Sequence, residues 1–322
     1  MLPTTNPAFL GLQNQCRVLP VLGFQDTLEH LLLQQEIDVV HAHNLHRDHC
    51  PGLARSIVKT CQVRRIPVII TVHDIGAYST SSALASAKAA LSAAMCVTTS
   101  SYNHKLLAKT FGVRAAAIIE PCVSFPVTPS VDSTQAASIA IPGRLHPPKG
   151  ILESALIAGH LSNSLGPVTV MLSNYRHPHY GADMAYVNAI GDLCGSFPKL
   201  NCVFNEAGDP SSLYHGASVT ICMPLAPEGF GIVPLESLAS GTPVIVHPLG
   251  GLSWTAGVRG VRIGDPFDAL KTCTLLHDMM FNRSALREEI AQGRAALEER
   301  FSPHIMAARY LAVYERAAKH RY

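Results

Sequence analysis

Charged residues are scarce in this chain of 322 residues: they make up 15% of it, whereas apolar residues make up 48%. The net charge is only +2 with histidine neutral, and no block of five or more like charges occurs. Because such a mild balance gives little attraction to a polyanion, we do not expect nucleic acid as a partner. The high apolar content argues against a disordered chain, and the length suits two domains of ordinary size.

Paired cysteines and long apolar segments are lacking as well. The nine cysteines are scattered and none forms a C-x-x-C pair, which indicates reduced, mostly buried thiols and favours a cytoplasmic location. The start of the chain has no basic segment followed by a long apolar run, so we expect no secretory signal. The most apolar long window, residues 81–99, is rich in alanine and serine and contains Lys88. It is a poor candidate for a membrane span.

One basic stretch keeps a peripheral membrane contact open. It holds four cations in eleven residues: Arg55, Lys59, Arg64 and Arg65. A solvated helix face is the simpler interpretation. Contact with an anionic acceptor or with a membrane surface is the alternative.

Short β-branched runs alternate with helical patterns along the whole chain. This alternation is typical of βαβ units and predicts an α/β protein with parallel, doubly wound sheets. In the first half we predict strands at residues 17–22, 37–41, 67–72, 94–98 and 115–119, with helices at 24–35, 50–63, 82–93 and 101–111. In the second half we predict strands at residues 137–141, 168–172, 201–204, 218–223, 243–247 and 258–263, with helices between them and a final helix at 303–319.

The alternation is interrupted by residues 121–136, which are rich in proline, serine and threonine and have no helical period. We therefore predict two Rossmann-like domains, with a ligand cleft between them that faces the carboxyl ends of the strands. The predicted boundaries are an N-terminal domain at 1–125, a linker at 126–136, a C-terminal domain at 137–302 and a last helix at 303–322 that crosses back to the first domain.

The segment from Met223 to His247, M-P-L-A-P-E-G-F-G-I-V-P-L-E-S-L-A-S-G-T-P-V-I-V-H, carries the clearest chemistry. A strand is expected to end at Met223 and to be followed by a glycine-bearing loop. Pro234 suits the first turn of a short helix, and Gly241 suits the position just after its end. Backbone N–H groups would then be free at a helix N-terminus, an arrangement that binds phosphate.

Two glutamates, Glu228 and Glu236, flank this loop at a spacing of eight positions. Carboxylates beside an anion site are unfavourable unless they bind hydroxyl groups. A sugar and a ribose would supply such hydroxyl groups.

This segment resembles the E-x7-E motif of glycosyltransferase family 4, a family of the GT-B superfold. The family pattern E-G-F-G-L-x-x-L-E-A-M-A-x-G-x-P-V stands here as E-G-F-G-I-V-P-L-E-S-L-A-S-G-T-P-V. Residues 141–151, I-P-G-R-L-H-P-P-K-G-I, resemble the family's G-R-x4-K-G signature. The resemblance implies that Arg144 and Lys149 face the donor diphosphate, where cations would stabilise the charge of the leaving group.

A further resemblance lies in T-V-H-D at residues 71–74, where a family histidine contacts the transferred sugar. His73 would take this role, and a purely structural hydrogen-bonding histidine is the alternative. The segment 208–219, G-D-P-S-S-L-Y-H-G-A-S-V, resembles the family helix that leads into the strand before the glutamate motif. The resemblance covers most of residues 37–322.

The chain departs from the family pattern in two places. No glycine-rich loop of the family's opening strand stands before residue 37, so we expect a truncated N-terminal, acceptor-side domain. After the second strand of the second domain, L-S-N-Y at residues 172–175 replaces a glycine-rich turn, so the nucleotide contact can differ there.

Four closely spaced histidines offer an alternative metal site: His41, His43, His46 and His49. An H-x-H pair places both rings on one face of a strand, which can bind zinc. Because the family tolerates V-H-A-H-N strings at this strand end without metal, we expect no metal and no other cofactor.

The resemblance implies a retaining glycosyltransferase of the hexosyltransferase type, which moves a sugar from a nucleotide-diphosphate sugar to an acceptor hydroxyl. It implies catalytic roles for Glu228 and His73 and ribose binding by Glu236. The implied diphosphate ligands are Arg144, Lys149, Gly229, Phe230, Gly231 and Ile232. The acceptor stays open among small metabolites, lipids and glycans. The alternative is a reduced donor-binding or scaffold subunit, which needs a partner subunit or a second copy of itself for activity.

Overall fold

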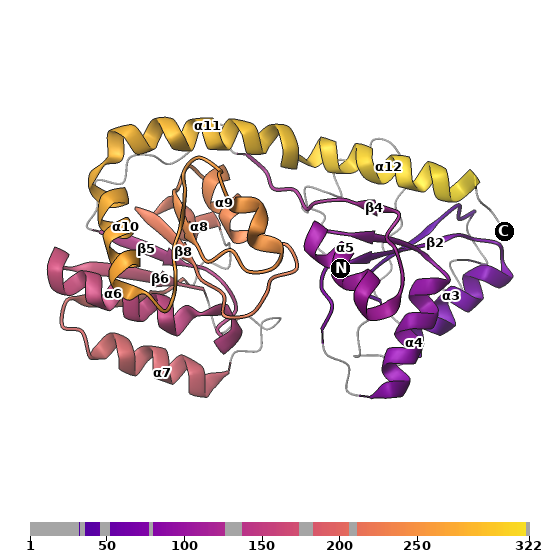
Figure 1. Cartoon of the computed structure of the whole chain (residues 1–322), viewed down its shortest axis with the longest axis horizontal. Helices are drawn as coiled ribbons and strands as arrows, with labels where there is room; N and C mark the ends of the chain where they lie inside the picture. Colours follow the sequence, from indigo (N-terminus) through magenta and orange to yellow (C-terminus); the bar gives the residue numbers. More distant parts are fainter. Residues whose placement is uncertain are drawn as a thin grey trace. The chain divides into compact units, whose positions relative to one another are not determined.

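The structure is a computed structural model, and it describes residue 32 and residues 36–45, 52–76, 80–125, 137–173, 183–205 and 211–319. The chain forms two compact units, one of Met1–Cys122 with Phe301–Tyr322 and one of Val123–Arg300 (Figure 1). The predicted first strand, the predicted linker and all but one residue of the predicted first helix lie outside the described residues. The expectation of a truncated first domain concerns the same part of the chain.

The first unit contains a parallel sheet with the strand order β1-β2-β3-β4. Its strands are β1 (Val40–His43), β2 (Val68–Val72), β3 (Met95–Thr98) and β4 (Ala117–Ile118). Every residue of β2 is buried, as expected for a parallel strand that is covered on both faces.

Three helices connect these strands: α3 (Leu53–Val63), α4 (Ser81–Ser92) and α5 (Ser101–Phe111). Two of them begin at side-chain caps, because the hydroxyl of Thr80 accepts a hydrogen bond from Ala83 N–H and that of Ser100 accepts one from Asn103 N–H. Such caps satisfy helix donors that would otherwise have no partner. They therefore fix the residues at which α4 and α5 begin.

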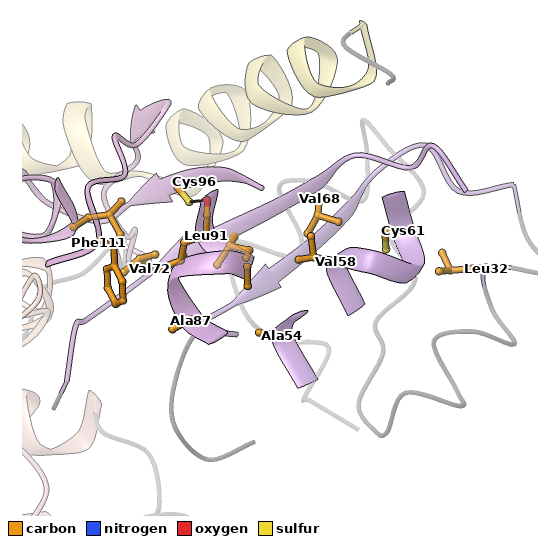
Figure 2. Packing of buried hydrophobic residues seen from close by; sticks show 13 residues of the cluster. Leu32, Ala54, Val58, Cys61, Val68, Val72, Ala87, Leu91, Cys96 and Phe111 are labelled. Carbon is orange, nitrogen blue, oxygen red and sulfur yellow. Dashed lines mark hydrogen bonds between the residues drawn. The ribbon is translucent and has the colours of Figure 1, made fainter. Parts of the chain in front are cut away.

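The two faces of this sheet have separate cores. On one face, Val68, Ile70 and Val72 pack against residues of α3, α4 and α5, among them Ala54, Val58, Cys61, Ala87, Leu91 and Phe111 (Figure 2). On the other face, Ile69 and Val97 pack against α12 (Pro303–Lys319). The last helix of the chain is therefore part of the first unit.

The second unit contains a six-stranded sheet with the order β10-β9-β8-β5-β6-β7, and every pairing is parallel. The strands are β5 (Ser138–Ile141), β6 (Val168–Leu172), β7 (Leu200–Phe204), β8 (Val219–Cys222), β9 (Val244–Val246) and β10 (Val261–Ile263). The strand order reverses at β5, which lies between β8 and β6.

Helices flank this sheet, and 3₁₀ turns lie in its loops. They are α6 (Ile151–Leu165), α7 (Met184–Gly195), α8 (Ser211–His215), α9 (Val233–Ala239), α10 (Ala269–Phe281) and α11 (Arg283–Phe301), with the 3₁₀ turns η1 (Pro147–Lys149) and η2 (Gly251–Thr255). Helix α6 packs against both α7 and α10, and α8 packs against α9. Among the described helices, none is long and apolar enough to cross a membrane.

The predicted α/β class with two parallel sheets is confirmed, and most predicted elements lie within a few residues of the observed ones. The predicted strand 37–41 starts three residues before β1 and ends two residues before the end of β1. The ladder between β1 and β2 starts with Val40 opposite Val68. The residue before Val68 is Pro67, which has no N–H to donate, so the ladder cannot extend further back.

Candidate functional site

Two loops of the second unit meet at the carboxyl ends of β5 and β8. The first, residues 142–150, follows β5, and the second, residues 223–232, follows β8. The two are bonded directly, since Leu225 N–H donates to the carbonyl of Pro148 at 3.0 Å. Because β5 and β8 are neighbours at the point where the strand order reverses, this is the position at which doubly wound sheets bind ligands.

Gly150 allows this close approach. Its φ is +64°, and a Cβ atom at this position would overlap the backbone carbonyl of Met223. Only glycine combines a left-handed conformation with so short a distance to the neighbouring backbone. Gly150, the last glycine of the G-R-x4-K-G signature, therefore allows the two loops to contact each other.

Lys149 and Glu228 form an ion pair across these loops. The ammonium Nζ of Lys149 donates to Oε1 of Glu228 at 2.5 Å, and the side chains are 28% and 21% exposed. Lys149 ends η1, whereas Glu228 lies in the loop after β8. The structure thus brings together a cation and a carboxylate that stand 79 positions apart in the sequence.

The backbone of Glu228 is anchored to the loop after β9. Its carbonyl accepts a hydrogen bond from Gly251 N–H at 2.6 Å, and it forms an isolated parallel bridge with Gly250. A Cβ atom on Gly250 would lie 2.8 Å from the same carbonyl oxygen. The two glycines therefore hold the Glu228 backbone in place, so the direction of its side chain is restricted.

In the loop from Gly229 to Ile232, the ring of Phe230 is buried. That ring stacks on Trp254 with the centroids 5.3 Å apart, and the indole N–H of Trp254 donates to the carbonyl of Phe230 at 3.2 Å. The side chain of Phe230 is therefore part of the packed interior of the second unit. No side chain caps the start of α9 at Ile232.

The ends of α9 agree with the sequence prediction. Pro234 lies in its first turn, and Ser240 is its C-cap residue. Gly241 follows with a φ of +81°. This left-handed conformation ends the helix, as expected for a glycine just after a C-cap.

Glu236 is held by a tyrosine that the sequence analysis did not single out. The hydroxyl of Tyr214 donates to Oε2 of Glu236 at 2.7 Å. Burial, together with the negative charge of Glu236, raises the pKa of Tyr214 well above its usual value. The tyrosine therefore stays a proton donor, and its own backbone is fixed because Thr242 donates to its carbonyl at 2.9 Å.

Tyr214 lies in α8, within the segment 208–219 whose resemblance to a family helix was noted. Its distance from Glu236 in the sequence, 22 positions, gives no periodic signal. The pairing becomes visible only once α8 packs against α9. From the sequence, the only indication of its role was that Tyr214 stands in a segment that resembles a family helix.

Arg144 lies in the loop after β5 with an exposed side chain. Among the residues that the structure describes, none bonds to its guanidinium group. Its neighbour Gly143 donates its N–H to the hydroxyl of Ser173 at 2.9 Å. Ser173 stands where the chain departs from the family's glycine-rich turn, and its hydroxyl supports the loop that carries Arg144.

His73, at the end of β2 in the first unit, is held by its backbone from two sides. Its N–H donates to Oδ1 of Asn44 at 2.8 Å, and its carbonyl accepts a hydrogen bond from Nδ2 of Asn103 at 2.6 Å. Asn44 follows β1 in a left-handed conformation, with φ at +51°. Asn103 is buried in the first turn of α5. Residues after three neighbouring strands therefore meet at His73.

The side chain of His73 pairs with that of His43. Nε2 of His73 lies 2.7 Å from Nδ1 of His43, and the two rings stack with the centroids 5.1 Å apart. Desolvation and the neighbouring His73 lower the pKa of His43 to about 4. Desolvation also lowers the pKa of His73, an effect that Asp74 partly offsets. Both rings are therefore neutral at pH 7.

His41 connects this region to α12. Its Nδ1 lies 2.7 Å from the hydroxyl of Tyr314, and its Nε2 lies 2.8 Å from that of Thr71. The hydroxyl of Thr71 also contacts that of Tyr310 at 3.0 Å. Burial, with repulsion from His43 and the third histidine of this region, lowers the pKa of His41 to about 3.

These contacts bear on the alternative of a metal site. The rings of His41 and His43 lie 4.4 Å apart, but both nitrogens of His41 are engaged with hydroxyl groups. In the part of the chain that the structure describes, no group of three or more histidine, cysteine or acidic side chains is placed to hold a metal ion. His46 and His49 lie outside the described residues.

Two family models match this chain. The model described as glycosyltransferase family 4 matches residues 6–124, and the model described as glycosyl transferases group 1 matches residues 202–257. The second match contains both Glu228 and Glu236. The first begins well before residue 37, so the likeness extends further toward the N-terminus than the motifs indicated.

Curated relatives match over parts of the chain. An MMP alpha-(1->4)-mannosyltransferase of Mycolicibacterium hassiacum is 34% identical over 98 residues, which are 30% of this chain and 24% of the relative. A D-inositol 3-phosphate glycosyltransferase of a Nocardioides species is 30% identical over 148 residues, which are 45% of this chain and 32% of the relative. The matches thus span about a quarter to a third of the relatives' lengths.

Solved structures resemble the whole fold. The HepE protein of Anabaena, in complex with UDP-glucose, has a TM-score of 0.69 at 17% identity, covering 87% of this chain and 79% of that one. A glycosyltransferase of Rickettsia africae has a TM-score of 0.67 at 18% identity, covering 99% and 84%. Two α/β units, each with a parallel sheet, and the likeness to these structures define a GT-B fold. Over the two matched parts and at the glutamate motif, the chain is similar to glycosyltransferase family 4.

Proposed function

We propose that this chain transfers a sugar from a nucleoside-diphosphate sugar to an acceptor hydroxyl group, with retention at the anomeric carbon. The observation that carries the proposal is the Lys149–Glu228 pair, formed by two loops at the point where the strand order of the second unit reverses. A cation and a carboxylate side by side match a donor that carries both phosphates and sugar hydroxyl groups. Retention is carried over from the family that the glutamate motif resembles.

The diphosphate would bind at the loops 142–150 and 223–232. Lys149 and Arg144 supply side-chain cations, and the loop Gly229–Ile232 supplies backbone N–H groups. As the bond between the anomeric carbon and the diphosphate oxygen breaks, negative charge develops on the leaving group. Fixed donors and cations stabilise this charge more strongly than the ground state, which lowers the barrier.

The carboxylates would bind hydroxyl groups. Glu236, oriented by Tyr214 at 2.7 Å, is suited to the two hydroxyls of a ribose because a carboxylate accepts two hydrogen bonds side by side. Glu228 would bind sugar hydroxyls close to the anomeric carbon. For His73, the family resemblance implies a contact with the transferred sugar. The acceptor oxygen then bonds to the anomeric carbon, and its proton leaves with the nucleoside diphosphate.

The donor site is tested by thermal denaturation in the presence of UDP, GDP, ADP and their sugar conjugates. UDP comes first, because the HepE neighbour is a complex with UDP-glucose. A nucleotide at a hundred times its Kd adds about 2.7 kcal/mol to the free energy of unfolding. We expect one base to stabilise the wild type and to lose this effect in Lys149→Ala.

The transfer itself is tested with acceptor hydroxyls, starting with D-inositol 3-phosphate because several relatives carry that name. Release of nucleoside diphosphate that depends on acceptor supports the proposal. Nucleotide binding without transfer, together with activity restored by an added protein, would instead favour a donor-binding subunit that needs a partner.

A further inference from the structure

A single proton lies between the rings of His43 and His73. Their nitrogens Nδ1 and Nε2 are 2.7 Å apart, a hydrogen-bond distance. A neutral imidazole has one N–H donor and one bare acceptor nitrogen. One ring must therefore donate and the other must accept, so the tautomers of the two histidines depend on each other.

This dependence fixes the character of the other nitrogen of His73. If His43 donates from Nδ1, then Nε2 of His73 is bare and its Nδ1 carries a proton. If His43 accepts at Nδ1, then Nε2 of His73 carries the proton and its Nδ1 is bare. The state of His43 thus decides whether Nδ1 of His73 can donate or accept a hydrogen bond.

The surroundings leave His73 little other freedom. Asn44 and Asn103 hold its backbone N–H and carbonyl, so only side-chain rotation is left. The ring of His43 restricts this rotation in two ways, through the hydrogen bond and through stacking at an interplanar angle of 22°. Desolvation keeps both rings neutral, as described above, so the shared proton is the normal state of the pair at pH 7.

We propose that His43 is a positioning residue, which fixes the ring orientation of His73 and couples the tautomer of His73 to its own, so that the hydrogen-bonding character of Nδ1 of His73 depends on His43. The role in transfer rests on the proposed function. The role in setting the tautomer rests on the contacts of the first unit alone. The two can therefore be measured separately.

The structural test is ¹⁵N NMR of histidine side chains, which distinguishes the two neutral tautomers, with His73 assigned by its loss in His73→Gln. We expect one tautomer of His73 in the wild type and an average of both in His43→Ala. His43→Asn should restore the hydrogen bond to the His73 ring, because an asparagine amide reaches about the position of Nδ1. The exposed His304 of α12 supplies the control His304→Ala, which should leave the spectrum of His73 unchanged.

The functional test is transfer by the same variants. We expect His43→Ala to lower kcat by about 10- to 100-fold with little change in the KM of the donor, because the second unit holds the nucleotide. His43→Asn should recover most of the loss.

An unchanged tautomer of His73 in His43→Ala would overturn the proposal, whether or not the chain shows transfer. A normal kcat in that variant would overturn the role in transfer. If the wild type binds no nucleotide, the proposed function fails while the NMR result still decides the role of His43.

Discussion

The ammonium group of Lys149 lies 2.5 Å from a carboxylate oxygen of Glu228, although 79 positions separate them in the sequence. Each residue stands in the loop that follows a strand, and the two strands, β5 and β8, are hydrogen-bonded neighbours. The pair links the two motifs that carry the likeness to family 4. It also predicts that changes at either residue affect donor binding far more than folding.

Glu228→Ala should abolish transfer and leave the fold intact. The pair is 28% and 21% exposed, and partly exposed ion pairs contribute at most about 1 kcal/mol to the free energy of unfolding. The matched control is Glu289→Ala, which removes the ion pair of Arg262 with Glu289 in the same unit at similar exposure, 34% and 30%. Both variants should have similar melting temperatures, but only Glu289→Ala should retain turnover. Near-normal turnover of Glu228→Ala would contradict the assignment.

Tyr214→Phe should weaken donor binding. It removes the hydrogen bond that orients Glu236 and leaves a carboxylate with one fewer partner, which costs about 1–3 kcal/mol. Tyr186 offers the control, since its hydroxyl accepts a hydrogen bond from Leu152 N–H in the same unit. Calorimetric titration with the nucleotide should show a raised Kd in Tyr214→Phe and an unchanged Kd in Tyr186→Phe. Equal affinities of all three proteins would rule out the orienting role.

Gly150→Ala should destabilise the second unit. The substitution places a Cβ atom on a residue with φ at +64° and forces it against the carbonyl of Met223, so we expect a loss of at least about 1–3 kcal/mol. Gly191, in α7, has open space around it and no positive φ. Gly191→Ala should therefore stabilise the protein by up to about 1 kcal/mol. Denaturation followed through Trp254, the single tryptophan of the chain, measures both.

Acid should destabilise the first unit. The pKa of His41 falls from 6.5 to about 3 on folding, so between these values the unfolded chain binds more protons than the folded one. The stabilising effect of the neutral ring is complete above pH 6.5 and is lost as the pH falls, by about 1.4 kcal/mol per pH unit for one such group. Amide hydrogen exchange of α12 should therefore accelerate between pH 7 and pH 5.

The control for this prediction is His41→Gln, which retains hydrogen-bonding groups without titrating near neutral pH. It should show a smaller acceleration of exchange in α12 over the same interval. Trp254 reports the second unit independently. An exchange rate of α12 that is no more sensitive to acid in the wild type than in His41→Gln would contradict the account.

Much of the fold was predictable because its signals are local. The bounds of β6, α5 and α12 agree with the predicted ranges, since each is delimited by caps, glycines or prolines next to a periodic segment. The parallel order of the sheets followed from the alternation of strands and helices. Strand pairing itself depends on contacts between distant residues, and this is why the start of β1 was misplaced.

The candidate site was predictable only as far as motifs carry it. Glu228, Lys149 and Glu236 stand in strings whose spacing indicates their position, and the structure places Lys149 against Glu228 as neighbouring loops require. Tyr214, Ser173 and the pairing of His43 with His73 are fixed by tertiary packing. No periodicity in the sequence predicts such contacts, so they can be identified only in the folded chain.

The central claim is most directly tested by product analysis after incubation with the nucleoside-diphosphate sugar that stabilises the chain, in the presence of acceptors. The account predicts a glycosylated acceptor whose anomeric configuration equals that of the donor, formed by the wild type and by Glu289→Ala but not by Glu228→Ala. Product of inverted configuration would contradict retention. Product formed equally well by Glu228→Ala would contradict the site itself.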